Sequence, residues 1–362
     1  MKNILLIAGT RPNFIKLAPL YHTLKKQSEF SIKVCHTGQH FDKNMSDSFW
    51  DLLEIPSPDY MLGCKGANST EIIGRTIIAL NEVILSQKFD VVVVFGDVNA
   101  TVSGAIVSSH HRVKVIHVEA GLRSFDRDMP EEVNRVITDH ISDYLMVSEE
   151  SGLVNLKREG IDENKTVFVG NIMIETLIQT RNKWERIETD IVDTNSKYIV
   201  ATFHRPENVD TLENLQIVVS LFEQLSGDNK IVFPIHPRTK KQLAEFNLWE
   251  KLSSNKQVII TEPLDYFTFL KLVSKANCVV TDSGGIQEET SFLNVPCVTL
   301  RKNTERPVTI TNGTNKLCSI KDESLVIDIV NHIKTIQSQQ PTAIKFWDDG
   351  VSSRICEVIK SI

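Results

Sequence analysis

Charged side chains crowd the segment 117–135, HVEAGLRSFDRDMPEEVNR, which continues from an apolar stretch typical of a buried strand. His117 and Glu119 end that stretch, and the charged residues that follow are Arg123, Asp126, Arg127, Asp128, Glu131, Glu132 and Arg135. Open α/β sheets bind ligands in the crevice beyond the carboxyl ends of their strands. Because a fold gains nothing from so many charges there, the segment predicts acid–base chemistry on an anionic substrate.

Two carboxylates occupy equivalent positions at strand ends. Asp97 follows the apolar run DVVVVF, and Glu119 follows the run VKVIHV. Carboxylates that share one crevice can divide the acid and base roles when their surroundings push their pKa values apart. The alternative is that each caps a following helix, which applies above all to Asp97. His204 and His236 also follow strand patterns, and two such histidines favour a site over a structural role.

The segment 281–289, TDSGGIQEE, joins an apolar strand pattern to the start of a helix. Ser283 is placed to cap that helix, and Gly284 and Gly285 would let a ligand approach the backbone. The N–H groups and the dipole of a helix start favour phosphate, so we predict phosphate binding here. An ordinary capped strand–helix turn is the alternative that a bare Gly-Gly pair leaves open.

Arg11 and Lys16 lie near the start of another predicted helix, directly after the first strand pattern. Cations at a helix start oppose the dipole, so another interaction must favour them, such as a bound phosphate or carboxylate. A surface position on an amphipathic helix is an equally good explanation of Lys16 and a weaker one of Arg11.

Several common sites lack their motifs. The strand–helix turns of the N-terminal half do not match G-x-G-x-x-G, so we expect no nicotinamide or flavin cofactor. The absence of G-x-x-x-x-G-K-[ST] disfavours NTP hydrolysis, and the absence of G-x-S-x-G disfavours a serine hydrolase. His117 and Glu119 have the spacing of two metal ligands, but no third ligand follows at a recognisable spacing, so we expect no metal.

The composition is typical of a globular protein, with 362 residues, 41% hydrophobic, 24% charged and a formal net charge of −6. The negative charge disfavours nucleic acid as a partner. Six scattered cysteines without a Cys-x-x-Cys pair are typical of a reducing compartment. The N-terminal apolar run is too short for a secretory signal, and no run approaches ~18 apolar residues, so we expect a cytoplasmic protein without a membrane span.

Strand and helix patterns alternate along the chain. The strand patterns fall at 4–8, 32–36, 90–95, 113–118, 144–147, 167–169, 198–203, 231–235, 258–260, 278–281 and 296–300. This alternation predicts an α/β fold of two Rossmann-like, doubly wound domains that face a cleft. The polar segment 179–197 predicts a hinge. We therefore expect domains over 1–178 and 179–345, with a last helix in 346–362 that packs back on the first.

A series of motifs carries a family resemblance over about the first 310 residues. The motifs are GTRP at 9–12, TGQH at 37–40, GDVN at 96–99, HVEAGLRS at 117–124, MPEEVNR at 129–135, SD at 142–143, FHRPENVD at 203–210, HPRT at 236–239, and TDSGGIQEE to TERP at 281–307. Their order and length resemble the UDP-N-acetylglucosamine 2-epimerase family of bacteria and archaea, in its non-hydrolysing type. The resemblance implies a GT-B-like pair of domains and a homodimer that acts on UDP-sugars in cell-surface polysaccharide biosynthesis.

The resemblance also implies roles for single residues. Around the reacting sugar it places Asp97, Glu119, Glu131, Arg135 and His204, and the catalytic candidates among them are Asp97, Glu119, Glu131 and His204. Near the sugar and phosphates it places Arg11 and Lys16, with Arg306 as a further charged residue. Facing the diphosphate it places His236, Ser283, Gly284 and Gly285. In the C-terminal, UDP-binding domain, Phe269 would stack near the uracil and Glu289 would hold the ribose hydroxyls.

The chemistry implied is the inversion of C2 of UDP-GlcNAc to give UDP-ManNAc. No carbonyl acidifies the C2 proton, so the family expels UDP first or concurrently, forms a 2-acetamidoglucal, and adds UDP back with protonation from the other face. This route needs cations and helix dipoles for the departing UDP and carboxylates for the proton. Asp97 is the favoured base, Glu119 and Glu131 come next, and His204 assists.

Alternatives concern the sugar and the fate of UDP. Family members that a second UDP-GlcNAc activates have the motifs QHRQ and HRRE. This chain has QHFD at 39–42 and the pair Arg205–Pro206 in their places. Activation by a second UDP-GlcNAc therefore stays open. QHFD occurs in relatives that act on modified sugars such as UDP-2,3-diacetamido-glucuronate. A hydrolysing 2-epimerase would use the same site. A GT-B glycosyltransferase and a nucleotide-sugar sensor are disfavoured, because neither needs Asp97, Glu119 and Glu131 together.

Overall fold

The computed structural model describes residues 1–38, 50–227 and 229–362. The chain divides into two compact units. Unit 1 comprises Met1–Gln179 and Lys345–Ile362, and unit 2 comprises Thr180–Ile344. The residues 39–42, on which the alternatives of substrate activation and of a modified sugar depend, lie outside the described residues.

Unit 1 contains a parallel sheet with the order β3-β2-β1-β4-β5-β6-β7 among the residues described. Its strands are β1 (Lys2–Ala8), β2 (Phe30–His36), β3 (Tyr60–Met61), β4 (Val91–Phe95), β5 (Lys114–Ala120), β6 (Tyr144–Val147) and β7 (Thr166–Phe168). In the register, Ile4 of β1 pairs with Ile32 of β2 and with Val91 of β4. The strand order reverses between β1 and β4, which is the switch point at which such sheets bind ligands.

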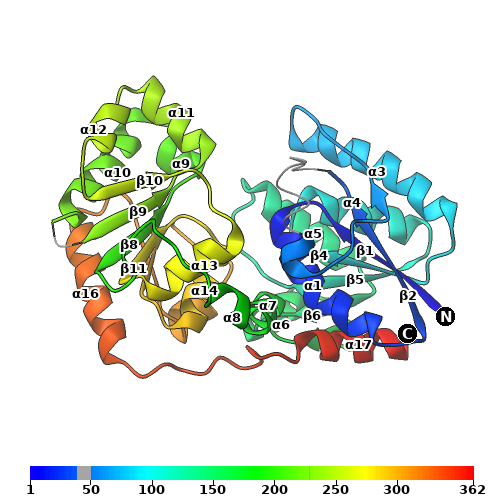
Figure 1. The fold of residues 1–362 in the computed structure, drawn as a ribbon. Helices are drawn as coiled ribbons and strands as arrows, with labels where there is room; N and C mark the ends of the chain where they lie inside the picture. Colours follow the sequence, from blue (N-terminus) through cyan, green and yellow to red (C-terminus); the bar gives the residue numbers. More distant parts are fainter. Residues whose placement is uncertain (39–49, 228) are drawn as a thin grey trace. The chain divides into compact units, whose positions relative to one another are not determined.

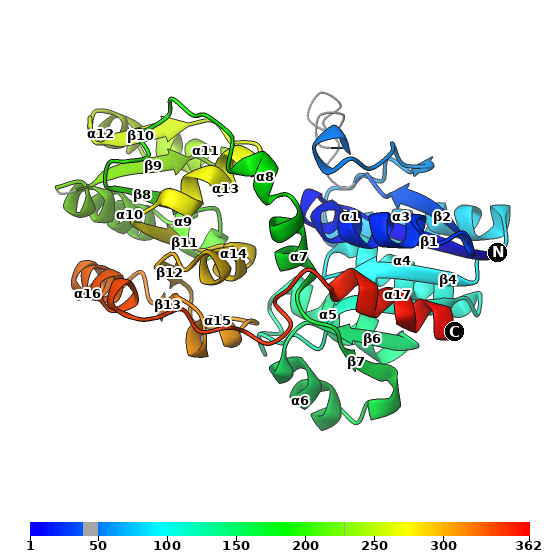
Figure 2. The same cartoon turned by 60° about the horizontal axis from the view of Figure 1, so that its bottom comes forward.

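Helices cover both faces of this sheet (Figures 1 and 2). They are α1 (Arg11–Lys25), α3 (Ser69–Ser86), α4 (Asn99–His110), α5 (Pro130–Ile141), α6 (Glu150–Arg158), α7 (Ile172–Gln179) and α17 (Val351–Ser361), with a 3-10 turn at Glu163–Lys165. α1, α7 and α17 pack against one another, and α4 packs against both α3 and α5. The whole of β4 is buried, because both of its faces are covered.

Unit 2 repeats the strand order with a second parallel sheet, β10-β9-β8-β11-β12-β13, in the part of the chain that the structure describes. Its strands are β8 (Tyr198–Thr202), β9 (Lys230–Pro234), β10 (Val258–Thr261), β11 (Cys278–Thr281), β12 (Cys297–Leu300) and β13 (Asn315–Cys318). Its switch point lies between β8 and β11. Two Rossmann-like, doubly wound sheets of this kind confirm the predicted α/β fold class.

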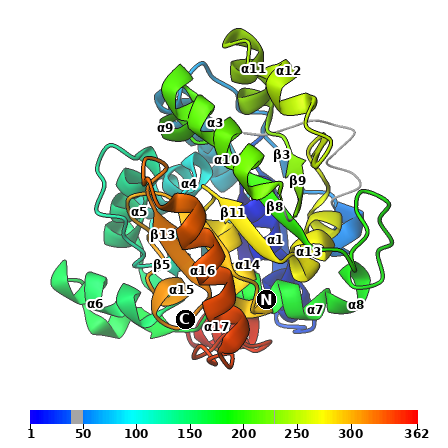
Figure 3. The ribbon, with the colours of Figure 1, turned by 90° about the vertical axis from the view of Figure 1, so that its left-hand side faces the viewer.

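The helices of unit 2 lie on the two faces of its sheet (Figure 3). They are α8 (Arg181–Trp184), α9 (Pro206–Val209), α10 (Leu212–Leu225), α11 (Pro237–Glu245), α12 (Trp249–Ser253), α13 (Tyr266–Lys275), α14 (Gly285–Leu293), α15 (Val308–Thr311) and α16 (Leu325–Ser338). Ile199 and Ala201 of β8 pack with α10 and α16, whereas Tyr198 and Val200 pack with α13. This alternation shows that β8 is covered on both faces.

The polar segment 179–197, in which the hinge stays a prediction, is part of unit 2 from Thr180 onwards. Trp184 is 2% exposed and Val192 is 4% exposed, and Lys271 of α13 donates a hydrogen bond to the carbonyl oxygen of Glu185 at 2.6 Å. Trp184 and Val192 are too far apart in the sequence to produce an apolar periodicity. The segment therefore packs on unit 2 although its pattern resembles a linker.

All six cysteines are buried free thiols, as expected of small apolar side chains. Within residues 1–38, 50–227 and 229–362, no helix has both the length and the apolar character needed to cross a membrane.

Candidate active site

The switch point of unit 1 brings basic and acidic side chains to the carboxyl ends of β1, β4 and β5. Lys16 of α1 and Glu119 at the end of β5 form an ion pair through Nζ and Oε2, with only 7% and 8% of the two residues exposed. Glu119 has a φ of 74°, and the register between β5 and β6 shifts between Val118 and Ala120. A left-handed backbone at a non-glycine residue is costly, and such strain concentrates at functional sites.

Gly96 makes room for that ion pair. A Cβ on Gly96 would lie 3.0 Å from Lys16 Nζ and 3.1 Å from Glu119 Oε2, and its φ of 65° suits glycine. The turn after β4 therefore lies against the Lys16–Glu119 pair and carries Asp97 at its next position. Two of the predicted carboxylates thus end neighbouring strands, as the sequence indicates.

Asp97 is held by a guanidinium. Its Oδ2 accepts a hydrogen bond from Arg135 Nη2, and the Asp97 side chain is 24% exposed. Arg135 is 3% exposed, and its Nη1 donates to Glu132 Oε2 at 2.8 Å. The alternative that Asp97 caps α4 is wrong, because the N-cap residue is Val98 and its side chain makes no capping hydrogen bond.

Glu131 and its neighbour Glu132 differ sharply in their surroundings. Glu131 stands in the first turn of α5 with an exposed side chain. Glu132 is 1% exposed and accepts hydrogen bonds from the backbone N–H groups of Ser124 at 2.9 Å and Phe125 at 3.0 Å, besides that of Arg135. Glu132 was not among the predicted site residues, although its i, i+3 spacing to Arg135 is a signal for such a pair.

Arg11 is the first residue of α1 and is half-buried. The first turn of α1 contains no acidic residue. Asn13 Oδ1 accepts hydrogen bonds from the N–H groups of Gly9 and Thr10, both at 3.1 Å, and so orders the turn before the helix. A cation at this helix start therefore has no carboxylate of its own turn to balance it, which suits an anionic ligand.

In unit 2 the end of β8 holds His204 against Asp282, which follows β11. His204 Nδ1 lies 2.9 Å from Asp282 Oδ1, and the His204 side chain is 40% exposed. Burial raises the pKa of Asp282, but the hydrogen bond and charge of His204, with the N–H groups of Arg205 and His204, outweigh burial and lower that pKa. Asp282 is therefore a buried carboxylate that orients His204. It was not a predicted site residue, although it adjoins Ser283.

His236 lies beside His204, with their ring centroids 5.5 Å apart. His236 is exposed and is the N-cap of α11, where its Nδ1 accepts the N–H of Arg238 at 3.2 Å. Because Nδ1 accepts, the neutral ring carries its hydrogen on Nε2. The two predicted histidines thus lie together at the ends of β8 and β9.

The helix start at α14 differs from the prediction in one respect. Ser283 does not cap α14: its N–H bonds to Thr281 Oγ1, and the N-cap residue is Gly284, without a side-chain capping bond. A Cβ on Gly284 would lie 2.7 Å from Glu305 Oε1 and 3.0 Å from Arg306 Nη1, whereas a Cβ on Gly285 would meet nothing within 4 Å. The backbone is therefore open at Gly285.

Two buried guanidiniums lie next to this helix start, close to Gly284. Arg306 is 6% exposed and its Nε lies 2.9 Å from Glu288 Oε1, while its Nη1 contacts Glu305. Arg301 is 4% exposed and bonds Glu305 Oε2 through Nη2 at 3.0 Å, and its Nε and Nη1 have no hydrogen-bond partner among the described residues. Arg301 was not a predicted residue. Helix start and guanidiniums together suit phosphate.

Two further predicted residues lie on α14 itself and on α13. Glu289 of α14 is 4% exposed, and burial, followed by the charge of Glu288, raises its pKa to about 7. Phe269 of α13 is half-buried against the apolar cluster that contains Val200. Glu289 can therefore donate or accept a hydrogen bond near neutral pH.

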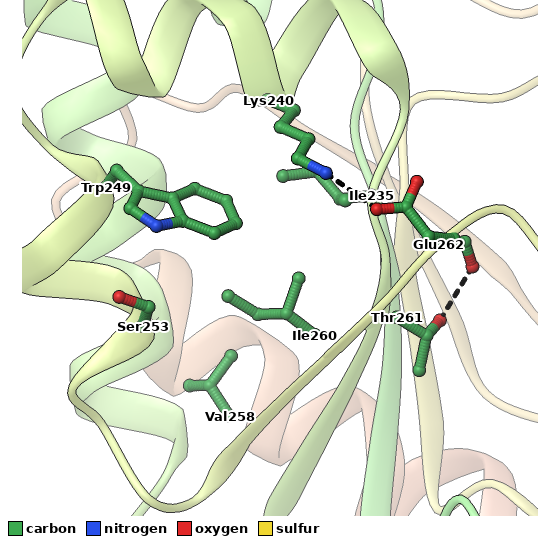
Figure 4. A pocket seen from close by; sticks show the side chains of 8 residues that line it. All are labelled: Ile235, Lys240, Trp249, Ser253, Val258, Ile260, Thr261 and Glu262. Atoms are coloured by element: carbon green, nitrogen blue, oxygen red, sulfur yellow. Dashed lines mark hydrogen bonds and ion pairs between the residues drawn. The ribbon is translucent and has the colours of Figure 1, made fainter.

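A separate pocket of about 410 Å³ opens beside the edge strand β10 (Figure 4). It is lined by Ile235, Lys240, Trp249, Ser253, Val258, Ile260, Thr261 and Glu262. Its two charged side chains bond each other, Lys240 Nζ to Glu262 Oε1 at 2.6 Å. None of the predicted site residues lines it. In the ranges that the structure describes, no group of three or more His, Cys, Asp or Glu side chains is arranged to hold a metal ion.

Comparisons with known proteins agree on one family. A family model described as UDP-N-acetylglucosamine 2-epimerase matches residues 22–360. A UDP-N-acetylglucosamine 2-epimerase of Methanocaldococcus jannaschii is 46% identical over 328 residues, which cover 89% of each chain. A UDP-2,3-diacetamido-2,3-dideoxy-D-glucuronate 2-epimerase of Pseudomonas aeruginosa is 36% identical over 99% of each chain. The solved M. jannaschii UDP-GlcNAc 2-epimerase in complex with UDP-GlcNAc and UDP has a TM-score of 0.91 at 42% identity, over 100% of both chains.

Proposed function

Because this chain belongs to the UDP-N-acetylglucosamine 2-epimerase family, we propose that it inverts C2 of a UDP-N-acetylhexosamine, UDP-GlcNAc to UDP-ManNAc, without hydrolysis. The observation that carries this proposal is the pair of carboxylates Asp97 and Glu119 at neighbouring strand ends, each held by its own cation. A reaction that removes and returns one proton on opposite faces of a carbon needs acids and bases in fixed places.

In the proposed reaction Asp97 takes the C2 proton while the bond from C1 to the phosphate oxygen breaks. The electron pair of the C2–H bond forms a C1–C2 double bond, and UDP departs with the electrons of the C1–O bond. UDP then adds back to C1, and an acid returns a proton to C2 from the other face. Glu119 or Glu131 would supply that proton, with His204 assisting. The hydrogen bond from Arg135 Nη2 holds the Asp97 carboxylate in a fixed place for this step.

Unit 2 would bind UDP. The open backbone at Gly285 and the guanidinium of Arg306 suit the diphosphate, with His236, Ser283 and Gly284 nearby. Phe269 would stack near the uracil, and Glu289, with a pKa of about 7, would bond the ribose hydroxyls. Arg11 and Lys16 would contact the sugar and phosphates. We further propose a cytoplasmic homodimer that needs no metal or nicotinamide and serves cell-surface polysaccharide synthesis.

A second candidate is the same inversion on a UDP-sugar with further substituents. It is favoured by the Pseudomonas aeruginosa relative, which is 36% identical to this chain and is named for UDP-2,3-diacetamido-2,3-dideoxy-D-glucuronate. That sugar carries an additional carboxylate, so a substrate of this kind would need a further cation near the site.

Incubation with UDP-GlcNAc in D2O tests the proposal. Both C2 epimers should appear by NMR, each with deuterium at C2 and with UDP still attached. Turnover without deuterium at C2 would contradict proton exchange, and accumulation of UDP with free N-acetylmannosamine would show a hydrolysing enzyme. Parallel incubation with UDP-2,3-diacetamido-2,3-dideoxy-glucuronate decides between the two substrates: the one with the higher kcat/KM is the natural class.

A further inference from the structure

His117 is completely buried on β5, two residues before Glu119. Its Nε2 lies 2.7 Å from the carbonyl oxygen of Gly96, and its Nδ1 lies 2.7 Å from Asp139 Oδ1. The ring thus connects the turn after β4 with α5, and it has no surface through which to touch a substrate. Neither the proposed proton transfers nor the proposed UDP contacts use it.

The hydrogen positions follow from the partners. The carbonyl oxygen of Gly96 can only accept, so Nε2 of His117 donates. Burial raises the pKa of Asp139, but the charges and hydrogen bonds of His117 and Arg123 outweigh it and lower that pKa. Nδ1 of His117 thus lies against a carboxylate, and the ring bridges the two ends of the connection.

The second carboxylate oxygen of Asp139 also accepts hydrogen bonds. Its Oδ2 accepts the N–H of Gly121 at 3.1 Å and Nη1 of Arg123 at 2.7 Å. The Arg123 guanidinium in turn bonds both carboxylate oxygens of Glu159, at 2.8 and 2.7 Å. Asp139 has no exposed side-chain surface and Arg123 has 1%, so the connection is rigid and shielded from water.

Side chains on one face of α5 support both Gly96 and Asp97, the two residues of the turn after β4. Arg135 bonds Asp97 directly, and Asp139, one helical turn later, holds Gly96 through His117. Residues four apart on a helix lie on one face, so α5 carries the two supports side by side. The N–H of Gly96 is bonded as well, to the carbonyl oxygen of Val118 at 2.9 Å.

We propose that His117 is a positioning residue that sets the place of Asp97 relative to Glu119 through its hydrogen bond to Gly96. This inference rests on the proposed function, in which the two carboxylates act on one carbon. Displacing a catalytic group by about 1 Å can cost about a hundredfold in rate, because proton transfer needs near-contact geometry. His117 is fixed on β5 two residues before Glu119, so it links the turn that carries one carboxylate to the strand that carries the other.

A matched pair of variants separates the two hydrogen bonds of the ring. In His117→Gln the amide nitrogen reaches the position of Nε2 and can still donate to Gly96. In His117→Asn the shorter amide matches Nδ1 and can bond only Asp139. We expect His117→Asn to lower kcat by about ten- to a hundredfold with KM changed less than about threefold, and His117→Gln to keep most of kcat. Equal loss in both variants, or an unchanged kcat in His117→Asn, would overturn the proposal.

Two readouts do not depend on activity. In wild-type protein labelled with 15N-histidine, a slowly exchanging Nε2–H signal should be present and should vanish in His117→Gln. In hydrogen exchange, the segment 94–99 should exchange at least about tenfold faster in His117→Asn than in His117→Gln, while UDP binding stays the same. Absence of the imidazole signal, or equal exchange of that segment, would refute the positioning role. Failure of the wild type to epimerise any UDP-sugar would refute the proposed function and leave these two readouts unchanged.

Discussion

Lys16 and Glu119 form a buried ion pair across two secondary-structure elements, and Glu119 makes it from a left-handed backbone with a φ of 74°. The bulge that interrupts the register of β5 and β6 at this point turns Glu119 toward α1. Gly96 is the neighbour that allows the approach, because a side chain there would meet both partners. The fold therefore accepts a strained residue and two buried charges at one strand end, which a purely structural turn would avoid.

Removing one partner of the Lys16–Glu119 ion pair should destabilise the folded protein. We expect Lys16→Met to lower the free energy of unfolding by about 3 kcal/mol, because Glu119 would be left buried without its cation. Urea unfolding measures this change. Lys33→Met is the matched control, since Lys33 pairs with Asp59 in an ion pair whose side chains are 39% and 29% exposed. This control substitution should lower the free energy of unfolding by less than about 1 kcal/mol. Equal losses in the two variants would mean that the burial of Lys16 has no energetic consequence.

The role of Asp97 can be tested without disturbing UDP. Asp97→Asn keeps the size of the side chain but removes the base, so epimerisation should fall below detection. Because UDP is expected to bind to unit 2, its affinity should stay within about tenfold, or ~1.4 kcal/mol, by calorimetry. Asp128→Asn, at an exposed acid between β5 and α5, should leave the rate unchanged. Normal epimerisation by Asp97→Asn would make the base assignment wrong.

The strand ends of the site could be predicted because runs such as VVVVF identify buried strands and the residue after them. Asp97, Glu119 and His204 are predicted to lie at strand ends in this way, and the doubly wound fold class follows from the alternation of elements. The partners could not be predicted. Asp139 and Asp282 meet His117 and His204 only through the packing of α5 on β5 and of β11 beside β8, which no spacing in the sequence reports.

Other features leave no local pattern. The bulge at Glu119 has no sequence signal of its own, because the residue in the left-handed position is not glycine, the type that would mark it. Strand β3 is too short, with two residues, to show alternation. The one signal that was available is the spacing of Glu132, Arg135 and Asp139, which gives α5 a buried polar face. A polar stripe at helical spacing next to strand ends indicates a network that supports a site.

The helix start of α14 offers a test of the diphosphate site. Gly285→Ala should leave the melting temperature within about 2 °C, because the added Cβ meets no atom within 4 Å. The same Cβ would occupy the space from which a phosphate approaches the backbone, so UDP affinity should fall at least about tenfold in calorimetry. Gly227→Ala, at an exposed glycine where the added Cβ would lie 3.8 Å from the carbonyl oxygen of Gln224, should change neither quantity. Unchanged UDP binding in Gly285→Ala would place the diphosphate elsewhere.

Glu175 should make the stability of unit 1 depend on pH. This residue of α7 is 1% exposed and accepts hydrogen bonds from the N–H and the hydroxyl of Ser352, at 2.6 and 2.5 Å, at the start of α17. Burial nevertheless raises its pKa from 4.5 to about 7, because these bonds only partly compensate. A carboxyl group that holds its proton more tightly in the folded state stabilises that state at low pH, and the stabilisation fades as the pH rises.

The unfolding free energy of the wild type should therefore lose up to about 3 kcal/mol from this group between pH 4.5 and pH 7, relative to Glu175→Gln. Glutamine cannot ionise, so the difference between the two proteins isolates the titration of Glu175 from that of all other groups. Urea unfolding at several pH values measures it, and Glu150→Gln, at an exposed carboxylate, should track the wild type. A constant difference between wild type and Glu175→Gln across this range would show that folding does not raise the pKa of Glu175.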